Sequence, residues 1–276
     1  MYNPNAFPAR ETETINPNKL AIYNWLKKDT EQSNLTASLE EMEDAIDQAG
    51  TEPQYAQEVV ERDQLSTKKQ FEAFKKNPDI NGPVFEFIFE KLGSSGAFGD
   101  NIEIIRTNNY DDYNNKTDFV LKINDQYIAL DLTAAELSSN RSPKYAETID
   151  KLNEKKFTNL KYYIDDSRDK PGALNDIPKV IIETSPSSLE EICDEIVRAG
   201  GLGKAKITKE VVKKSPLAKF TLEQTFQQLQ SQAFFLNDKF LGSSPTNAEK
   251  YKTMLDKVLE IRDTISEEIK KSQTTK

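Results

Sequence analysis

The chain has 276 residues, with 37 basic and 46 acidic side chains and a formal net charge of −9 at neutral pH. It contains no histidine and one cysteine, which excludes histidine-based triads, histidine-ligated zinc, internal disulfides and multi-cysteine metal sites. Carboxylate, lysine, serine, threonine and tyrosine side chains are left for chemistry, and metal-assisted chemistry on oxygen ligands fits that set best.

Hydropathy and charge also bear on where the protein works. No apolar run approaches the roughly 18 residues that a membrane helix needs, and the first residues lack the apolar core of a signal peptide. We therefore expect a cytoplasmic protein that does not contact membranes. The overall acidity disfavours non-specific binding of nucleic acids, although a local basic surface still binds phosphates.

Residues 1–80 are predicted to form an acidic helical N-terminal region. Helices are expected from Pro17, after Asn34, and from Pro53 to Lys76, because apolar residues recur there at helical spacing behind typical start signals. These apolar stripes are most simply packing faces.

Residues 81–200 are predicted to form an α/β core. Its expected order is a helix, a three-strand meander, a helix and a strand, at 82–92, 102–107, the two arms of 116–133, from Pro143 onward, and 179–184. Residues 108–115, NNYDDYNN, are expected to form a mobile polar loop. A helix from about 187 to 199 follows, and a buried structural thiol is the expected state of Cys193 on its apolar face.

Residues 201–276 are predicted to contribute a basic loop and C-terminal helices that pack on the core. The helices are expected at about 221–241 and 245–271. The loop is rich in glycine and lysine, and its cationic side chains are either a solvated charged face or a surface that follows a nucleic-acid backbone, namely Lys204, Lys206, Lys209, Lys213 and Lys214.

The segment KTDFVLKINDQYIALDLT, residues 116–133, has the alternation of a β-hairpin. A two-residue turn at Asn124-Asp125 brings the apolar side chains of both arms to one face, and a one-residue slip would bring a carboxylate into the core. In this register Asp118 lies opposite Asp131. Directly opposed carboxylates repel each other, and a cation between them would remove that repulsion.

The Asp118–Asp131 pair therefore predicts a site for Mg²⁺ or Mn²⁺, with the backbone carbonyl of Leu132 as a further ligand. The alternative is that the two residues are solvated on an exposed sheet face. A third possibility is an ordinary α/β protein in which the pair is incidental.

The order of elements and the two acids resemble the PD-(D/E)XK nuclease superfamily, whose core is restriction-endonuclease-like, over about residues 80–185. In that family an Asp begins the second strand, and a second acid, any residue and a lysine lie on the third strand. Asp118 and Asp131 match the two acids. The resemblance implies that a glutamate of the preceding helix assists, a place that Glu86 or Glu90 would fill.

The chain departs from the family motif at Thr133, which stands where the family has its lysine. That lysine positions the attacking water and stabilises developing negative charge. The hairpin register places Lys116 opposite Thr133, so Lys116 is a candidate for the missing ammonium, with a solvated loop lysine as the alternative. Lys144, Lys155 and Lys156 of the next helix are weaker candidates.

The resemblance, together with Thr133 in place of the family lysine, implies two possible functions. The first is a divergent metal-dependent nuclease that cleaves nucleic-acid phosphodiesters, with Asp118, Asp131, Glu86, Lys116 and Thr133 in its active site. The second is a nuclease-fold protein that has lost catalysis and serves as an interaction or regulatory module. In that case the flanking helices would bind a protein partner or a second copy of the chain.

Overall fold

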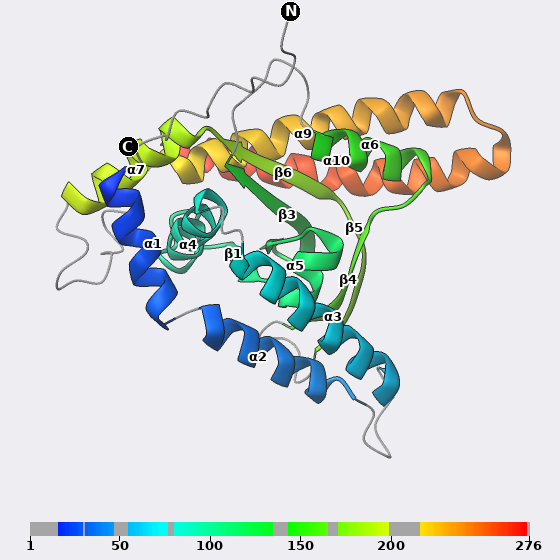
Figure 1. The fold of residues 1–276 in the computed structure, drawn as a ribbon. Helices are drawn as coiled ribbons and strands as arrows, with labels where there is room; N and C mark the ends of the chain where they lie inside the picture. Colours follow the sequence, from blue (N-terminus) through cyan, green and yellow to red (C-terminus); the bar gives the residue numbers. More distant parts are fainter. Residues whose placement is uncertain are drawn as a thin grey trace, which may run out of the picture.

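The computed structural model describes residues 16–29, 31–46, 55–76, 80–134, 143–164, 171–198 and 216–274. The chain forms a mixed α/β structure in which a small sheet is surrounded by helices (Figure 1). The N-terminal helices are α1 (Pro17–Asp29), α2 (Glu31–Asp44) and α3 (Gln57–Lys76). The elements that follow are α4 (Asn81–Ser94), β1 (Ile102–Arg106), α5 (Asn109–Asn115), β2 (Phe119–Ile123), β3 (Gln126–Ala134), α6 (Pro143–Asn153), β4 (Thr158–Tyr163), β5 (Gly172–Ile177), β6 (Lys179–Thr184), α7 (Pro186–Arg198), α9 (Leu217–Leu241) and α10 (Pro245–Thr274).

The main sheet has the strand order β1-β2-β3-β6. Strands β1, β2 and β3 form an antiparallel meander, and β6 joins β3 in parallel after the α6 crossover. Phe119 pairs with Leu130 and Ile123 with Gln126, as the predicted turn at Asn124-Asp125 requires. Asn124 takes a left-handed conformation with φ 53°, which a two-residue hairpin turn demands at its first position. The predicted register is therefore confirmed from Phe119 to Leu130, whereas Asp118–Asp131 and Lys116–Thr133 lie beyond the paired residues.

Both faces of the sheet are covered by protein. Phe119, Leu121, Ile123, Ile128 and Leu130 pack in one large core together with apolar side chains of α4, α7, α9 and α10. The opposite face carries a smaller core in which Val120 and Ala129 pack against the β4–β5 hairpin. The alternative of two solvated Asp residues on an exposed sheet face is wrong for Asp131, which is buried, while Asp118 is half-buried.

Helix α9 lies along β6, the edge strand of the sheet, and α10 runs beside it in the opposite direction (Figure 1). Three glutamines spaced four residues apart on α9 bond the β6 backbone. Gln224 and Gln228 each accept a backbone N–H and donate to a backbone carbonyl, at Glu183 and Ile181 respectively. Gln232 donates to the carbonyl of Lys179 at 2.7 Å.

Two parts of the core differ from the sequence prediction. Residues 108–115 were expected to be a loop, but Asn109–Asn115 is the helix α5, because the Asn108 side chain caps it by accepting the amide of Tyr110. The β4–β5 hairpin was not predicted, because its sequence is polar and its pairing is irregular. Helix α3, expected from Pro53, begins at Gln57 and runs without interruption to Lys76.

The C-terminal helices bury apolar side chains, Leu222 and Leu229 of α9 and Val258 of α10 among them, in the same core as the sheet. The division into regions 1–80, 81–200 and 201–276 stays a prediction. Among the described helices, none combines the length and the apolar character needed to span a lipid bilayer.

Candidate functional site

Asp118 lies immediately before β2, where regular pairing with β3 ends. Its backbone N–H donates to the carbonyl of Leu130 at 2.9 Å, and its carboxylate Oδ2 accepts the N–H of Leu132 at 2.5 Å. The N–H and C=O of one strand residue point to the same side of the strand. The carbonyl of Leu132 therefore faces the side of β3 on which Asp118 lies, as the predicted ligand set requires.

Asp131 is buried in β3 with 2% of its surface exposed, and two lysines pair with its carboxylate. Lys144 Nζ of α6 lies 2.5 Å from Oδ1, and Lys179 Nζ of β6 lies 2.9 Å from Oδ2. The Lys144 side chain is 40% exposed, whereas that of Lys179 is 7% exposed. One ammonium is thus fixed inside the protein, and the other reaches Asp131 from the surface.

Lys179 was not predicted from the sequence, and Lys144 was only a weaker candidate. Lys179 opens the β-like run at 179–184, and its register opposite Ala129 brings its side chain to the face of Asp131. That parallel register has no local sequence signal, because a crossover of 44 residues separates the two strands. Lys116, the preferred candidate, is exposed, and its amine donates to the carbonyl of Tyr113 at 2.8 Å.

Glu86 and Glu90 of α4 both pair with Arg106 at the end of β1. The Arg106 guanidinium lies 2.7 Å from Glu86 Oε2 and 3.2 Å from Glu90 Oε2. Glu86 therefore belongs to the predicted helix, faces the sheet, and has the Arg106 guanidinium as its partner. The predicted assisting glutamate is held beside the acidic pair rather than exposed on the helix surface.

Asp112 of α5 is a further acid of this cluster that sequence reasoning missed. Burial and the nearby charge of Glu86 raise the pKa of Asp112 to about 7, and its side chain is within hydrogen-bonding reach of Asp118. The sequence signal for this helix is a capping residue, Asn108, followed by two acidic residues, Asp111 and Asp112, in the first turn. The prediction of a polar loop at 108–115 passed over that signal.

Burial raises the pKa of three carboxylates of the cluster, those of Glu86, Asp112 and Asp118. Burial raises the pKa of Asp118 well above its ordinary value, and the charges of Asp112, Glu86 and Asp131 add to the effect. Burial also raises the pKa of Glu86, although Arg106 opposes that shift. The repulsion within this cluster is therefore relieved either by protonation of some of its carboxylates or by additional positive charge.

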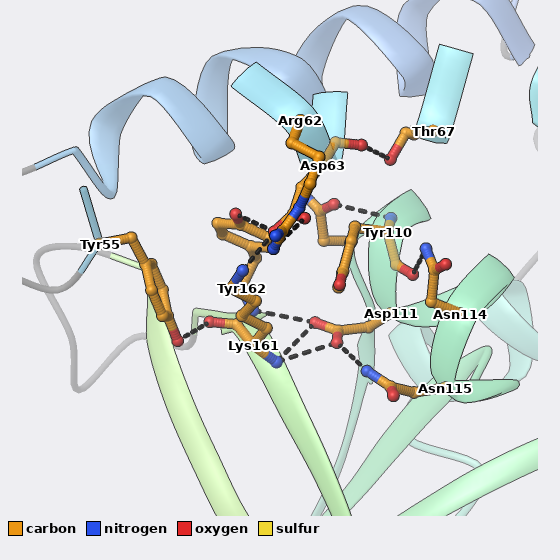
Figure 2. A network of polar contacts seen from close by, with 11 residues as sticks. Tyr55, Arg62, Asp63, Thr67, Tyr110, Asp111, Asn114, Asn115, Lys161 and Tyr162 are labelled. Carbon is orange, nitrogen blue, oxygen red and sulfur yellow. Dashed lines mark hydrogen bonds and ion pairs between the residues drawn. The ribbon is translucent and has the colours of Figure 1, made fainter. Parts of the chain in front are cut away.

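A second polar network holds α5 in place (Figure 2). The Asp111 carboxylate accepts the backbone N–H groups of Lys161 and Tyr162 in β4 and the side-chain amide of Asn115. The Lys161 ammonium bonds Asp63 of α3 and lies 4.7 Å from the centroid of the Tyr55 ring. The network thus ties α3, β4 and α5 together and fixes the helix that carries Asp112.

The donor set was tested against a divalent cation. Within the described ranges, no three His, Cys, Asp or Glu side chains converge as a metal-binding group. The oxygens of Asp118, Asp131 and the Leu132 carbonyl nevertheless suit Mg²⁺ or Mn²⁺ in kind. The Thr133 hydroxyl oxygen is buried without a hydrogen-bond partner in the described part of the chain, so the motif position has an unsatisfied polar atom.

The charge count favours a cation as well. Five carboxylates, Glu86, Glu90, Asp112, Asp118 and Asp131, face three cationic side chains, Arg106, Lys144 and Lys179. The ionised cluster has two negative charges in excess, which equals the charge of one divalent ion. The residues present therefore fit a divalent cation in donor chemistry, and the excess rises to three negative charges when Lys144 leaves Asp131 and frees a carboxylate oxygen.

The predicted nucleic-acid surface, Lys204, Lys206, Lys209, Lys213 and Lys214, lies outside the described residues. Comparisons of the chain with protein-family models, with curated proteins and with solved structures found no match.

Proposed function

We propose that the chain is a divergent metal-dependent nuclease-like protein that acts on nucleic-acid phosphodiesters, built on a restriction-endonuclease-like core over about residues 80–185. The observation that carries this proposal is the cluster of five carboxylates around Asp118 and Asp131, with its excess of two negative charges. The order of helix, antiparallel meander, helix and parallel strand supports it, because that frame is the one the resemblance implies.

In this proposal Mg²⁺ or Mn²⁺ is held by Asp118, Asp131 and the carbonyl of Leu132. A bound divalent ion lowers the pKa of a coordinated water and neutralises charge on a phosphodiester. The buried Lys179 holds the carboxylate of Asp131 in position through their ion pair. The exposed Lys144 side chain releases Asp131 and contacts a phosphate oxygen, so that it supplies the ammonium that Thr133 lacks.

The alternative function is a nuclease-fold module that no longer catalyses and binds a protein partner or a second copy. One observation favours it: both oxygens of Asp131 already pair with lysines. A protein in which these ion pairs are permanent would gain no stability from a divalent cation.

The two functions are separated by thermal unfolding with and without Mn²⁺, for the wild type and Asp118→Asn. A ligand that binds only the folded state raises the unfolding temperature. We expect an increase for the wild type that Asp118→Asn abolishes, and an unchanged increase for the control Asp125→Asn in the exposed hairpin turn. A wild type that shows no response at millimolar Mn²⁺ would contradict the nuclease proposal.

A cleavage assay completes the test. Single-stranded and duplex DNA and RNA would be incubated with Mg²⁺ or Mn²⁺, and we expect cleavage that depends on the ion and on Asp118. Cleavage that continues unchanged in Asp118→Asn would show that another site, or a contaminant, is responsible.

A further inference from the structure

A cavity of about 260 Å³ lies next to the carboxylate cluster, where α2 and α3 meet α4 and α5. Three aromatic side chains contribute to its lining: Phe71 and Phe74 of α3, and Tyr113 of α5. Glu86 and Arg106, which belong to the cluster described above, line the same cavity, as does Asp112. The cavity therefore borders the carboxylate cluster through these three residues and places aromatic side chains beside it.

The size and lining of the cavity restrict what it can hold. Sites for drug-sized molecules typically have volumes of about 300 Å³ or more. This cavity is slightly smaller, so its occupant would be about one ring system in size. Aromatic side chains provide stacking faces for a planar ring, and the side-chain amide of Asn34 can donate to its edge and accept from it. This combination suits a planar heterocycle with polar edges, which is what a nucleobase is.

We infer that this cavity receives one unpaired nucleobase of a single-stranded nucleic-acid substrate. The inference rests on the proposed function, because the cavity shares Glu86, Arg106 and Asp112 with the site that would bind the phosphodiester. A base inside a duplex is stacked and paired, so only a single strand or a splayed end presents a base that enters such a cavity.

Stacking of a base in the cavity would also offset the weak attraction between an acidic protein and a nucleic acid. The net charge is −9, and the cluster itself is acidic, so phosphate groups gain little from non-specific attraction. Stacking of a base on aromatic rings does not depend on the phosphate charge and tolerates any sequence. The cavity would therefore hold the substrate while a cation completes the cluster.

The experiment uses a single-stranded oligonucleotide that carries the fluorescent base 2-aminopurine, titrated with the full-length protein. The test variant is Phe74→Ala, because Phe74 is half-buried while Phe71 is fully buried. Stacking contributions imply that Phe74→Ala weakens binding by roughly 5- to 150-fold. Phe74→Tyr, which keeps the ring, should restore binding, and Leu65→Ala at an exposed position of the same helix should leave it unchanged.

Binding would be measured both in EDTA and in Ca²⁺, so that the result does not depend on whether a cation is needed. Duplex of the same sequence is expected to bind at least 5-fold more weakly than the single strand. Equal binding by wild type and Phe74→Ala in both conditions overturns the inference, as does equal binding of duplex and single strand. If Phe74→Ala fails to fold, Phe74→Leu removes the ring and keeps the apolar volume.

The outcomes separate this inference from the proposed function. A Mn²⁺-dependent increase in unfolding temperature together with binding that is independent of Phe74 would leave the nuclease proposal standing and remove the base cavity. Binding that depends on Phe74, without any Mn²⁺ response or cleavage, would indicate a protein that binds single strands without cutting them.

Discussion

Asp131 and Lys179 form an ion pair of 2.9 Å between neighbouring parallel strands, and neither side chain is more than 7% exposed. Burial lowers the pKa of Lys179, and the charge of Asp131 opposes that shift. The ammonium therefore depends on this carboxylate to stay charged inside the protein.

Replacing Asp131 by Ala should destabilise the protein by about 3–5 kcal/mol, because it leaves a buried cation whose remaining partners are the uncharged backbone carbonyls of Asn115 and Lys116. The measurement is urea unfolding followed by circular dichroism. The double variant Asp131→Ala/Lys179→Met should recover much of the loss. By contrast Lys144→Ala should cost less than about 1 kcal/mol, because the Lys144 side chain is largely exposed. Equal losses for Lys144→Ala and Lys179→Met would contradict this account.

Lowering the pH should stabilise the metal-free protein through Asp112. Its pKa is raised from 3.8 to about 7, mainly by burial and then by the charge of Glu86, so the folded state holds a proton that the unfolded state has lost. Stability contributed by this group therefore falls as the pH rises from about 4 to about 7. Unfolding temperatures in EDTA should show this fall, and Asp112→Asn should reduce it. A wild type and an Asp112→Asn variant with parallel profiles would show that Asp112 does not titrate in this range.

The sequence was sufficient for elements whose signals are local. Strand alternation and a two-residue turn determined the β2–β3 register, and helix start signals located α1, α6 and α10. The β4–β5 hairpin was missed because it is polar and irregular, and its burial arises from packing on Val120 and Ala129. Helix α5 was missed because a short polar helix is stabilised by its cap and its tertiary contacts rather than by an apolar stripe.

Asp111 should be important for stability although it lies outside the carboxylate cluster. Asp111→Ala leaves the backbone N–H groups of Lys161 and Tyr162 without their acceptor, which should cost at least about 1–3 kcal/mol. Asn114→Ala is the matched control on the same helix, because the hydrogen bonds of Asn114 to Gln70 and to the Tyr110 carbonyl are exposed, and it should change stability by less than about 0.5 kcal/mol. Denaturant unfolding compares the two variants, and similar losses for both would refute the anchoring role of Asp111.

Gln228 should stabilise the contact between α9 and β6. Its side chain accepts the N–H of Ile181 at 2.9 Å and donates to the carbonyl of the same residue. Gln228→Ala removes both partners, with an expected loss of about 1–3 kcal/mol in the free energy of unfolding. Gln227→Ala, one position away and exposed, should be close to neutral. A neutral Gln228→Ala would mean that water replaces the glutamine at this strand.

Cys193 should be unreactive in the folded protein. The thiol is fully buried, and burial raises its pKa to about 12, so almost no thiolate is present at pH 8. Alkylation by iodoacetamide should therefore follow unfolding, with rapid labelling only in denaturant. Labelling of the native protein at the rate of a small free thiol would show that Cys193 is accessible.

Only the contacts between residues close in sequence could be predicted at the candidate site. Asp118 and Asp131 belong to one hairpin, so a local pattern brought them together. Lys179 reaches Asp131 only through a parallel strand that follows a long crossover, and Arg106 meets Glu86 through packing of α4 on β1. Neither contact leaves a periodic signal in the sequence. The ammonium groups that pair with Asp131 belong to Lys144 and Lys179, and no spacing rule connects these lysines to the hairpin.

The three glutamines of α9 have a consequence for association between copies of the chain. An edge strand with unpaired N–H and C=O groups is a template on which another strand can add, which leads to domain swapping or fibrils. Gln224, Gln228 and Gln232 occupy those groups along β6. Helix α9 thus takes the place of a fifth strand without offering a new edge, and it ends the sheet at β6.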